Sequence, residues 1–273
     1  MTVLIFGAKG YLGQAFLTVY PDAVTTNADI ADSQAVAHVL DEVKPTVVIN
    51  TAGKTGRPNI DWCEEHKMET VRSNVTGPLV LLEECAKRGI YWVNLGSGCI
   101  YEGDNDGRGC SEEDPPNFSG SFYSRTKQWI DRILKEFPVL VLRLRMPFDG
   151  SANPRNLITK ISGYSRVLDV PNSITYLPDF LTASSELIEK GKTGLYNIVN
   201  PGVISPYRIM QIYKEIVNPA HAFERLTIEE MPQVARAGRS NCILSGKKLE
   251  AEGIRMRPVG EAVTEALKRL KEG

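Results

Sequence analysis

The stretch that decides the fold is VLIFGAKGYLG, residues 3–13, in which three glycines follow a short apolar run. The run predicts a buried strand, and the spacing after it predicts a helix over 11–19. A strand, a glycine-rich turn and a helix favour a phosphate-binding loop, because glycines admit a pyrophosphate and the helix start offers unpaired N–H groups. Glycines at this spacing also make ordinary tight turns. The cofactor-binding residues expected here are Gly7, Lys9, Gly10, Tyr11, Leu12 and Gly13.

Apolar runs and helical periods alternate along the rest of the chain. Strands are predicted at 3–6, 23–26, 46–51, 91–95, 139–145 and 195–199. Helices are predicted at 11–19, 33–43, 68–88, 121–137, 180–190, from Ser205 to about 217, and at 260–270. Strands that alternate with helices predict an α/β class, with a Rossmann-like, doubly wound parallel sheet.

Segments rich in proline, glycine and asparagine interrupt this alternation at 104–119, 147–155 and 170–173. Such insertions at the carboxyl ends of parallel strands build a ligand crevice. We therefore expect a dinucleotide-binding Rossmann domain over 1–146, with contributions from about 176–200. A smaller C-terminal substrate-binding lobe is expected over 147–175 and 201–273.

Composition narrows the class of partner. The 273 residues carry a formal net charge of −1, with basic and acidic residues interspersed, so neither nucleic acid nor a membrane surface is expected as a partner. The five cysteines lack paired spacing and the three histidines are dispersed, which favours free thiols in a cytoplasmic protein without a metal site. A small-molecule substrate is expected, and a homodimer is left open.

The second predicted strand ends at Thr25-Thr26-Asn27, where proteins that bind NAD usually carry an acid for the ribose hydroxyls. The missing carboxylate and the nearby Lys9 favour NADPH, with NADH as the alternative. Asp29 and Ile30 are expected to line the adenine pocket, although Asp29 could equally be an exposed turn residue. After the next strand, the cofactor is expected to contact Asn50, Thr51, Ala52 and Gly53.

Tyr123 and Lys127 lie one helical turn apart on a predicted helix, so their side chains share a face. A lysine ammonium stabilises a phenolate, so we expect a lowered pKa for Tyr123, which would then give a proton to a carbonyl oxygen. Ser97, at the end of a predicted strand, is expected to orient that oxygen. Taken alone, such a tyrosine and lysine pair is usually an ordinary helix surface. The glycine loop, the parallel sheet and the serine favour the catalytic interpretation.

The chain resembles the extended short-chain dehydrogenase/reductases, specifically the dTDP-4-dehydrorhamnose reductase group, and most of all the plant-type nucleotide-rhamnose synthases. The resemblance covers nearly the whole length and rests on TGRPNIDWCE (55–64), GCIYE (98–102), EEDPPNFSGSFYSRTK (112–127), LRLRMP (142–147), NPRNLITKI (153–161), PNSIT (171–175) and NPGVIS (200–205). The region TTNADIAD (25–32) and the insert after Glu102 depart from the plant pattern.

The resemblance implies a bifunctional enzyme that inverts C3 and C5 of a UDP- or dTDP-linked 4-keto-6-deoxyglucose and then reduces C4. By this resemblance, Cys99 and Lys160 are the acid and base of the epimerisation. From the residues alone, Cys99 is more often a packed thiol and Lys160 a solvated lysine. Substrate contacts are expected at Arg57, Asn59, Glu102, Arg145, Met146, Arg155, Asn156 and Arg239.

Two alternatives stay open. The first is a reductase without epimerase activity, which acts after a separate epimerase. The second is a binding module, because related folds include an NADP-binding regulatory subunit of methionine adenosyltransferase. The combination of Ser97, Tyr123 and Lys127 argues against the second alternative.

Overall fold

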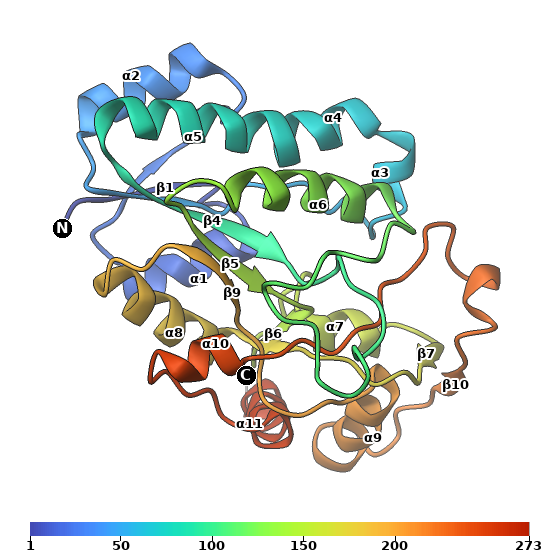
Figure 1. Cartoon of the computed structure of the whole chain (residues 1–273). Helices are drawn as coiled ribbons and strands as arrows, with labels where there is room; N and C mark the ends of the chain where they lie inside the picture. The colour runs from blue at the N-terminus through green and yellow to red at the C-terminus, as the bar shows by residue number, and fades with distance from the viewer. Residues whose placement is uncertain (273) are drawn as a thin grey trace.

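A computed structural model describes residues 1–272 and shows one six-stranded, wholly parallel sheet in the order β2-β1-β3-β4-β5-β9. Figure 1 shows the strands running side by side, with the carboxyl ends of β4 and β5 directed toward the C-terminal half of the chain. The strands are β1 (Val3–Phe6), β2 (Val24–Thr26), β3 (Val47–Asn50), β4 (Tyr91–Ser97), β5 (Leu140–Leu144) and β9 (Gly194–Asn197). The expected doubly wound α/β fold is confirmed.

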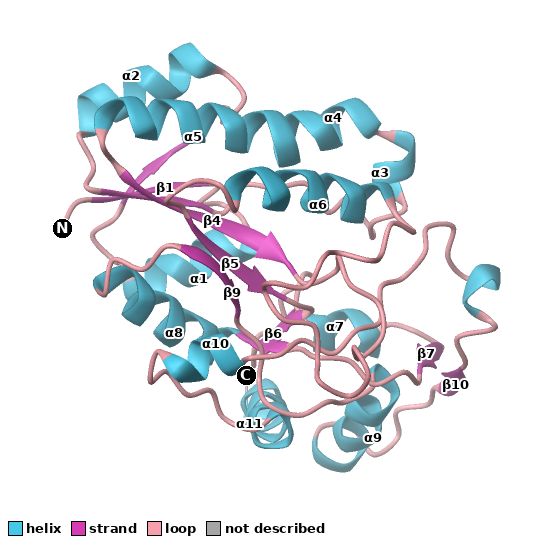
Figure 2. Ribbon diagram, in the orientation of Figure 1, coloured by secondary structure: helices cyan, strands magenta, loops and turns pink. Residues whose placement is uncertain are grey.

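Both faces of the sheet are buried along its inner strands, which is why β1, β3 and β5 are largely apolar runs, whereas the edge strand β2 is mostly exposed. Val3 and Ile5 of β1 point to a core shared with one helical layer, while Leu4 and Phe6 point to the opposite core. Figure 2 shows the two layers. One layer contains α2 (Ser33–Val43), α5 (Gly77–Arg88) and α6 (Phe122–Leu134), and the other contains α1 (Tyr11–Val19), α8 (Leu177–Glu189) and α10 (Lys247–Ala251).

A further apolar core lies beyond the carboxyl edge of the sheet and combines residues between Phe148 and Leu267. It is built from α7 (Leu157–Ser162), α9 (Pro206–Ile216), α11 (Val259–Glu272) and the two-stranded pairs β6 (Pro147–Phe148) with β8 (Thr175–Tyr176) and β7 (Arg166–Leu168) with β10 (Glu224–Leu226). A short 3₁₀-helical turn, η2, spans Met231–Gln233 after β10. This core places α7 and the segment after β10 beside the ends of the strands (Figure 1).

Most element boundaries agree with the expectation to within three residues, but the predicted helix over 68–88 is wrong as one continuous helix. The structure divides it into α4 (Lys67–Val71), a π-helical turn η1 (Arg72–Thr76) and α5, and it adds α3 (Trp62–Glu65) before them. The wider turn brings the Asn74 side chain to the backbone of Lys54. Its amide oxygen accepts from the Lys54 N–H across 2.7 Å, and its amide nitrogen donates to the Lys54 carbonyl across 2.9 Å. A tertiary contact thus replaces the regular helical repeat.

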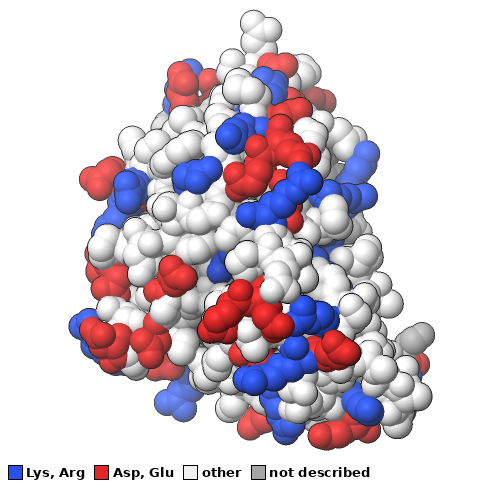
Figure 3. Space-filling model, turned by 90° about the vertical axis from the view of Figure 1, so that its right-hand side faces the viewer, with Lys and Arg blue, Asp and Glu red and all other residues white. Residues whose placement is uncertain are grey.

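Acidic and basic side chains are interspersed on the face shown in Figure 3. Within residues 1–272, no helix is both long and apolar enough to cross a bilayer. The same residues contain no group of three or more His, Cys, Asp or Glu side chains arranged to hold a metal ion.

Candidate active site

The glycine loop lies at the point where the order of the sheet reverses, because β1 pairs with both β2 and β3. Gly7 has a φ of 76°, and a Cβ there would lie 2.5 Å from the Ala52 nitrogen. A Cβ on Gly13 would lie 2.4 Å from the Gly7 oxygen. The start of α1 at Gly10 has no side-chain cap, so its N–H groups are available to an anion. This cradle fits a pyrophosphate.

Side chains of the loop differ in what they offer. Tyr11 and Leu12 pack against the core, so only their backbone groups are left for a phosphate. Burial and the Asp149 carboxylate raise the pKa of Tyr11. The side chain of Lys9 is exposed at the surface of the loop.

The segment after β3 forms the opposite wall. Asn50 donates to Asn94 on β4 across 2.9 Å and accepts from the Ala52 N–H, and Thr51 donates to the Phe6 carbonyl across 2.7 Å. These bonds fix the backbone that faces Gly7. A Cβ on Gly53 would lie 3.9 Å from Lys127 Nζ, so the segment runs from the glycine loop to the lysine on α6.

Asp29 and Ile30 have different surroundings. Ile30 is buried against Gly77, where a Cβ would meet its side chain at 2.4 Å. Asp29 is exposed and pairs with Arg72 across 2.8 Å. Hydrogen bonds, first from the Ala31 N–H and then from Arg72, hold the pKa of Asp29 below its usual range. Arg72 is a cation beside the end of β2 that the sequence analysis did not identify.

Tyr123 and Lys127 are both buried on α6, whose N-cap is Ser121. Lys127 Nζ donates to the Leu95 carbonyl on β4 across 3.1 Å. Burial lowers the pKa of Lys127, while Asp131 and Cys99 act in the opposite direction. The structure thus brings the tyrosine and the lysine to the carboxyl end of β4.

The expected lowering of the Tyr123 pKa by Lys127 is wrong for this structure. Burial raises the pKa of Tyr123, the neighbouring Cys99 adds to the increase, and a hydrogen bond with Ser97 opposes it. Desolvation dominates because the phenol is removed from water, and the ammonium is bonded to a backbone carbonyl instead. The phenol therefore stays protonated, which suits a proton donor.

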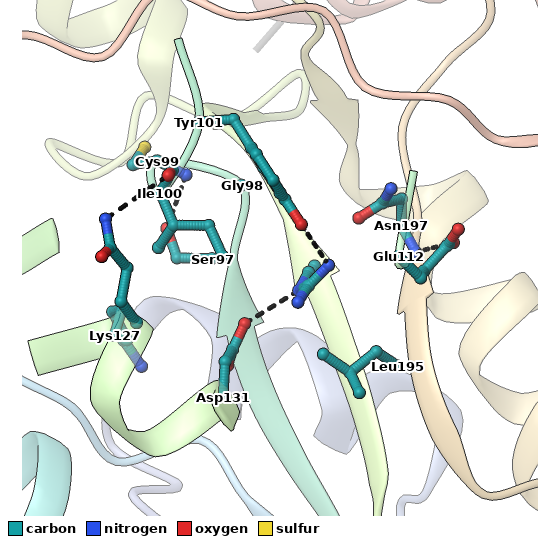
Figure 4. A network of polar contacts seen from close by, with 12 residues as sticks. Ser97, Gly98, Cys99, Ile100, Tyr101, Glu112, Lys127, Asp131, Leu195 and Asn197 are labelled. Carbon is teal, nitrogen blue, oxygen red and sulfur yellow. Dashed lines mark hydrogen bonds and ion pairs between the residues drawn. The ribbon is translucent and has the colours of Figure 1, made fainter. Parts of the chain in front are cut away.

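Cys99 lies beside Ser97 at the end of β4 (Figure 4). It is also close enough to Tyr123 and Lys127 to affect their pKa values. Its N–H donates to Ser97 Oγ across 3.1 Å, and its sulfur lies 3.2 Å from Arg145 Nη1. Of the five cysteines, Cys99 alone is partly exposed. A thiol that can reach solvent beside the serine and the phenol is placed for proton transfer to a common ligand.

Lys160 projects from α7 into a group of cations. Burial, and then the charges of Arg239 and Arg155, lower the pKa of Lys160, whereas Asp61 acts in the opposite direction. Arg155 Nη1 donates to the Gly56 carbonyl across 2.8 Å and to Thr55 Oγ1 across 3.1 Å. A cluster of three cations with one carboxylate is suited to a diphosphate.

Asp61 connects the segment after β10 to the segment between β3 and α3. It accepts from the Ala237 N–H across 3.0 Å and from Arg239 Nη1 across 2.8 Å. Burial opposes ionisation of Asp61, but these bonds, that of Arg239 first, hold its pKa below the usual range. Gly238 also donates its N–H to the Gly120 carbonyl across 2.8 Å. The segment therefore lies directly beside the loop that precedes Tyr123.

Arg57 is exposed, and its charge acts on Arg155. Asn59 accepts from the Asp61 N–H across 2.8 Å, and the Glu102 side chain is exposed. Met146 has a φ of 44°, an unusual conformation for a bulky residue at the end of β5.

Two residues predicted to bind substrate use their polar groups inside the protein. Asn156 is fully buried as the N-cap of α7, and its amide donates to Asp149 and to the Ser151 carbonyl. Arg145 is also buried, and its guanidinium contacts Ser240, Asn172 and Cys99. The contacts of Asn156 order the start of α7, and those of Arg145 link Cys99 to Asn172 and Ser240.

Three contributors escaped the sequence analysis: Asp61, Arg72 and Asn74. Each acts on a residue that is distant in the chain, since Asp61 bonds Arg239, 178 positions away, and Arg72 bonds Asp29, 43 positions away. No local motif marks such partners. Asp61 lies within the quoted string TGRPNIDWCE, which was the one available signal.

The glycine cradle at the reversal of a parallel sheet, with the serine, tyrosine and lysine at a neighbouring strand end, defines a Rossmann-like reductase. The chain belongs to the RmlD substrate binding domain family, that of the dTDP-4-dehydrorhamnose reductases, and the family model matches residues 1–272. It is 42% identical over 260 residues to the bifunctional dTDP-4-dehydrorhamnose 3,5-epimerase/dTDP-4-dehydrorhamnose reductase of Arabidopsis thaliana, covering 91% of this chain and 86% of the relative.

Other similarities agree with this family. A trifunctional UDP-glucose 4,6-dehydratase/UDP-4-keto-6-deoxy-D-glucose 3,5-epimerase/UDP-4-keto-L-rhamnose-reductase of Arabidopsis thaliana is also 42% identical over 260 residues, which are 91% of this chain but 39% of that protein. The crystal structure of a UDP-rhamnose synthase from Acanthamoeba polyphaga mimivirus superposes with a TM-score of 0.94, at 34% identity, covering 98% of this chain and 99% of that one.

Proposed function

We propose that this protein is a 3,5-epimerase/4-reductase that converts UDP-4-keto-6-deoxy-D-glucose, or its dTDP analogue, to the nucleotide-linked L-rhamnose. The observation that carries the proposal is the position of Cys99, whose N–H bonds Ser97 Oγ at 3.1 Å beside Tyr123. A group for proton transfer to carbon thus adjoins the groups for proton transfer to oxygen. The relatives in Arabidopsis and mimivirus, named for epimerase, reductase or UDP-rhamnose synthase activity, support it.

The residues fit a bound NADPH. Gly7 and Gly13 leave room for the pyrophosphate, because side chains there would collide with neighbouring backbone. The exposed Lys9 supplies positive charge at the glycine loop, which favours a 2′-phosphate over the free ribose hydroxyls, while the charge of Arg72 is balanced by Asp29. When bound, the cofactor would supply a hydride to the C4 carbonyl carbon.

Epimerisation uses the acidity of the C3 and C5 protons, which lie next to the C4 ketone. Lys160 or Cys99 removes a proton from one face of the sugar, and the other residue returns a proton to the opposite face. The resulting enolate oxygen accepts hydrogen bonds from Ser97 and Tyr123. The lowered pKa of Lys160 increases the fraction of neutral amine, which is the form that accepts a proton.

Reduction at C4 then requires a proton for the carbonyl oxygen. The buried Tyr123 phenol, which burial keeps protonated, donates it, while Ser97 orients the oxygen. Lys127 lies one turn further along α6 and donates to the Leu95 carbonyl. The groups that stabilise the enolate oxygen therefore also serve the reduction.

The nucleotide diphosphate is expected to lie against Arg155, Arg239 and Arg57, beside Lys160. Asp61 orients Arg239 through the 2.8 Å contact. This arrangement would direct the sugar toward the end of β4, and the segment from Asp61 to Glu64 adjoins both regions, since Glu64 accepts from the Phe122 N–H.

The test supplies UDP- and dTDP-linked 4-keto-6-deoxyglucose in parallel. With NADPH we expect the rhamnose nucleotide, and in D₂O without NADPH we expect deuterium at C3 and C5. Reduction without deuterium exchange would identify a reductase that follows a separate epimerase. The absence of both reactions would contradict the proposal, and copurification with an adenosyltransferase would then favour a regulatory subunit.

A further inference from the structure

Arg145 is a buried cation without a carboxylate partner. Its side chain is 1% exposed, and among the described residues it takes part in no salt bridge, whereas the equally buried Arg143 pairs with Asp131. Removing a charge from water without a counter-charge is costly, so such an arginine needs an explanation. The explanation lies in the groups that its guanidinium contacts.

Four N–H bonds of Arg145 reach acceptors, and three of these acceptors belong to groups that do not ionise. Nη1 contacts Ser240 Oγ at 3.1 Å and Cys99 Sγ at 3.2 Å, and Nη2 contacts the Ser240 carbonyl at 2.6 Å and Asn172 Oδ1. The fifth donor, Nε, is buried without a partner. Cys99 is therefore the one group in contact with the guanidinium that can become negatively charged.

Two other thiols near Arg145 do not compete for this role. Burial raises the pKa of Cys242 to about 11, although Arg145 acts in the opposite direction. Burial also raises the pKa of Cys110. Both are buried, while Cys99 is partly exposed and adjoins Tyr123 and Lys127. Cys242 and Cys110 therefore stay protonated at neutral pH, and Cys99 is the thiol whose negative charge Arg145 can balance.

We propose that Arg145 is the positioning residue of Cys99: it holds the sulfur in place and balances the negative charge that the sulfur carries during epimerisation. This inference rests on the proposed epimerase function. When Cys99 protonates a sugar carbon, the S–H bond breaks, the enolate electron pair forms the C–H bond, and the S–H electron pair stays on sulfur. Lys160 then releases to water the proton that it removed from the opposite face, and water returns a proton to the sulfur, so the exchange balances. In the opposite direction, the thiolate accepts the proton from carbon.

The local chain supports a positioning role. Arg145 directly follows β5, and the next residue, Met146, has a φ of 44°, where the chain turns away from the end of the strand. A Cβ on Gly98 would lie 3.3 Å from Arg145 Cβ, so the backbone before Cys99 packs directly on the arginine. The charged or titratable groups that act on Cys99 are Arg145, Lys127, Tyr123 and Cys242.

The experiment compares the wild type with Arg145→Lys and Arg145→Met. We measure the rate of Cys99 alkylation by iodoacetamide between pH 6 and pH 9, located by peptide mass mapping, and deuterium exchange at C3 and C5. In Arg145→Met we expect alkylation at pH 7 to slow about 10-fold and deuterium exchange to fall about 100-fold. Arg145→Lys should retain part of both rates, because it keeps the charge but loses the planar fork.

Arg225→Met serves as the control and should leave alkylation unchanged, because Arg225 is an exposed residue of β10 that pairs with Asp169, which follows β7. Thermal unfolding confirms that each variant is folded. If folded Arg145→Met is alkylated like the wild type across this pH range, the inference is wrong. If the wild type shows no deuterium exchange but Arg145→Met still slows alkylation, the role of Arg145 stands and the epimerase proposal fails.

Discussion

Asp131 and Arg143 form a buried ion pair, with Arg143 Nε 2.8 Å from Asp131 Oδ2, one helical turn beyond Lys127 on α6. Arg143 also donates to the Tyr101 hydroxyl across 3.1 Å, so the pair connects α6 to the loop after β4 (Figure 4). The pair therefore fixes the distance between the helix that carries the tyrosine and the sheet that carries the serine.

Replacing one member of this pair should be strongly destabilising. Asp131→Asn leaves the Arg143 charge buried without a partner, so we expect the free energy of unfolding to fall by about 3–5 kcal/mol. Urea denaturation measures the change. Glu113→Gln, which removes an exposed pair with Lys135, is the control and should cost less than about 1 kcal/mol. Equal effects of the two substitutions would show that the buried pair has no special importance.

Tyr123→Phe should impair the reductive step above all. The phenol donates the proton to the C4 oxygen, and loss of a general acid costs about 100-fold or more in rate. We would follow NADPH oxidation with the epimerised ketone as substrate. Deuterium exchange without NADPH should fall less, because Ser97 still contacts the enolate oxygen. Full retention of NADPH oxidation would remove Tyr123 from the proposed mechanism.

Cys99→Ser should separate the two activities in the opposite direction. A hydroxyl is a much weaker acid than a thiol, so deuterium exchange should fall about 100-fold or more, while reduction of a ketone that is already epimerised continues. Mass spectrometry detects the deuterium, and NADPH absorbance follows reduction. Similar losses in both assays would indicate that Cys99 packs the site and transfers no proton.

Gly7→Ala should prevent cofactor binding. The new Cβ would lie 2.5 Å from the Ala52 nitrogen, at the wall of the cradle. We expect the Kd for NADPH, from fluorescence titration, to rise at least about 10-fold. Gly89→Ala is the matched control, because Gly89 also has a positive φ of 63° but has open space around it. It should cost roughly 1–2 kcal/mol of stability and leave the Kd unchanged.

Arg155→Met should shift the pH dependence of epimerisation. Burial, Arg239 and Arg155 together lower the pKa of Lys160, so loss of one cation raises it toward the ordinary lysine value. The neutral amine exists above that pKa, and the rising limb of deuterium exchange against pH should therefore move to higher pH. Saturating substrate separates this shift from weaker diphosphate binding. Movement to lower pH would exclude Lys160 as the base.

The repetitive parts of this fold could be predicted from the sequence. The strands β1, β3 and β5 are largely apolar runs buried on both faces, whereas the edge strand β2 is mostly exposed. Ser121 and Ser205 indicate the starts of α6 and α9 as side-chain caps. The interrupted helix could not be predicted, because the π-helical turn depends on the bonds of Asn74 to Lys54, which lies 20 positions earlier. The helical spacing of apolar residues in 68–88 does not indicate that contact.

The residues of the site also divide into those that the sequence predicts and those that depend on contacts in the fold. Short spacings place Tyr123 with Lys127 and Ser97 near Cys99, so a pattern within one element was sufficient. The sequence does not indicate the direction in which a long side chain points. Arg145 was expected to face the sugar, yet its guanidinium contacts Asn172 and Ser240, and the sign of the Tyr123 pKa shift depends on burial that appears only in the fold.

The backbone bond between Gly238 and Gly120 has a consequence for how the enzyme responds to its medium. The neighbouring contacts of Glu65 with Arg236 and of Asp61 with Arg239 are ionic, and mobile ions screen the exposed first pair more strongly than the partly buried second pair. An amide bonded to a carbonyl is indifferent to ionic strength and to protonation. At high salt concentration or at low pH, the segment after β10 would keep this backbone hydrogen bond to the loop before Tyr123 after its ionic contacts have weakened.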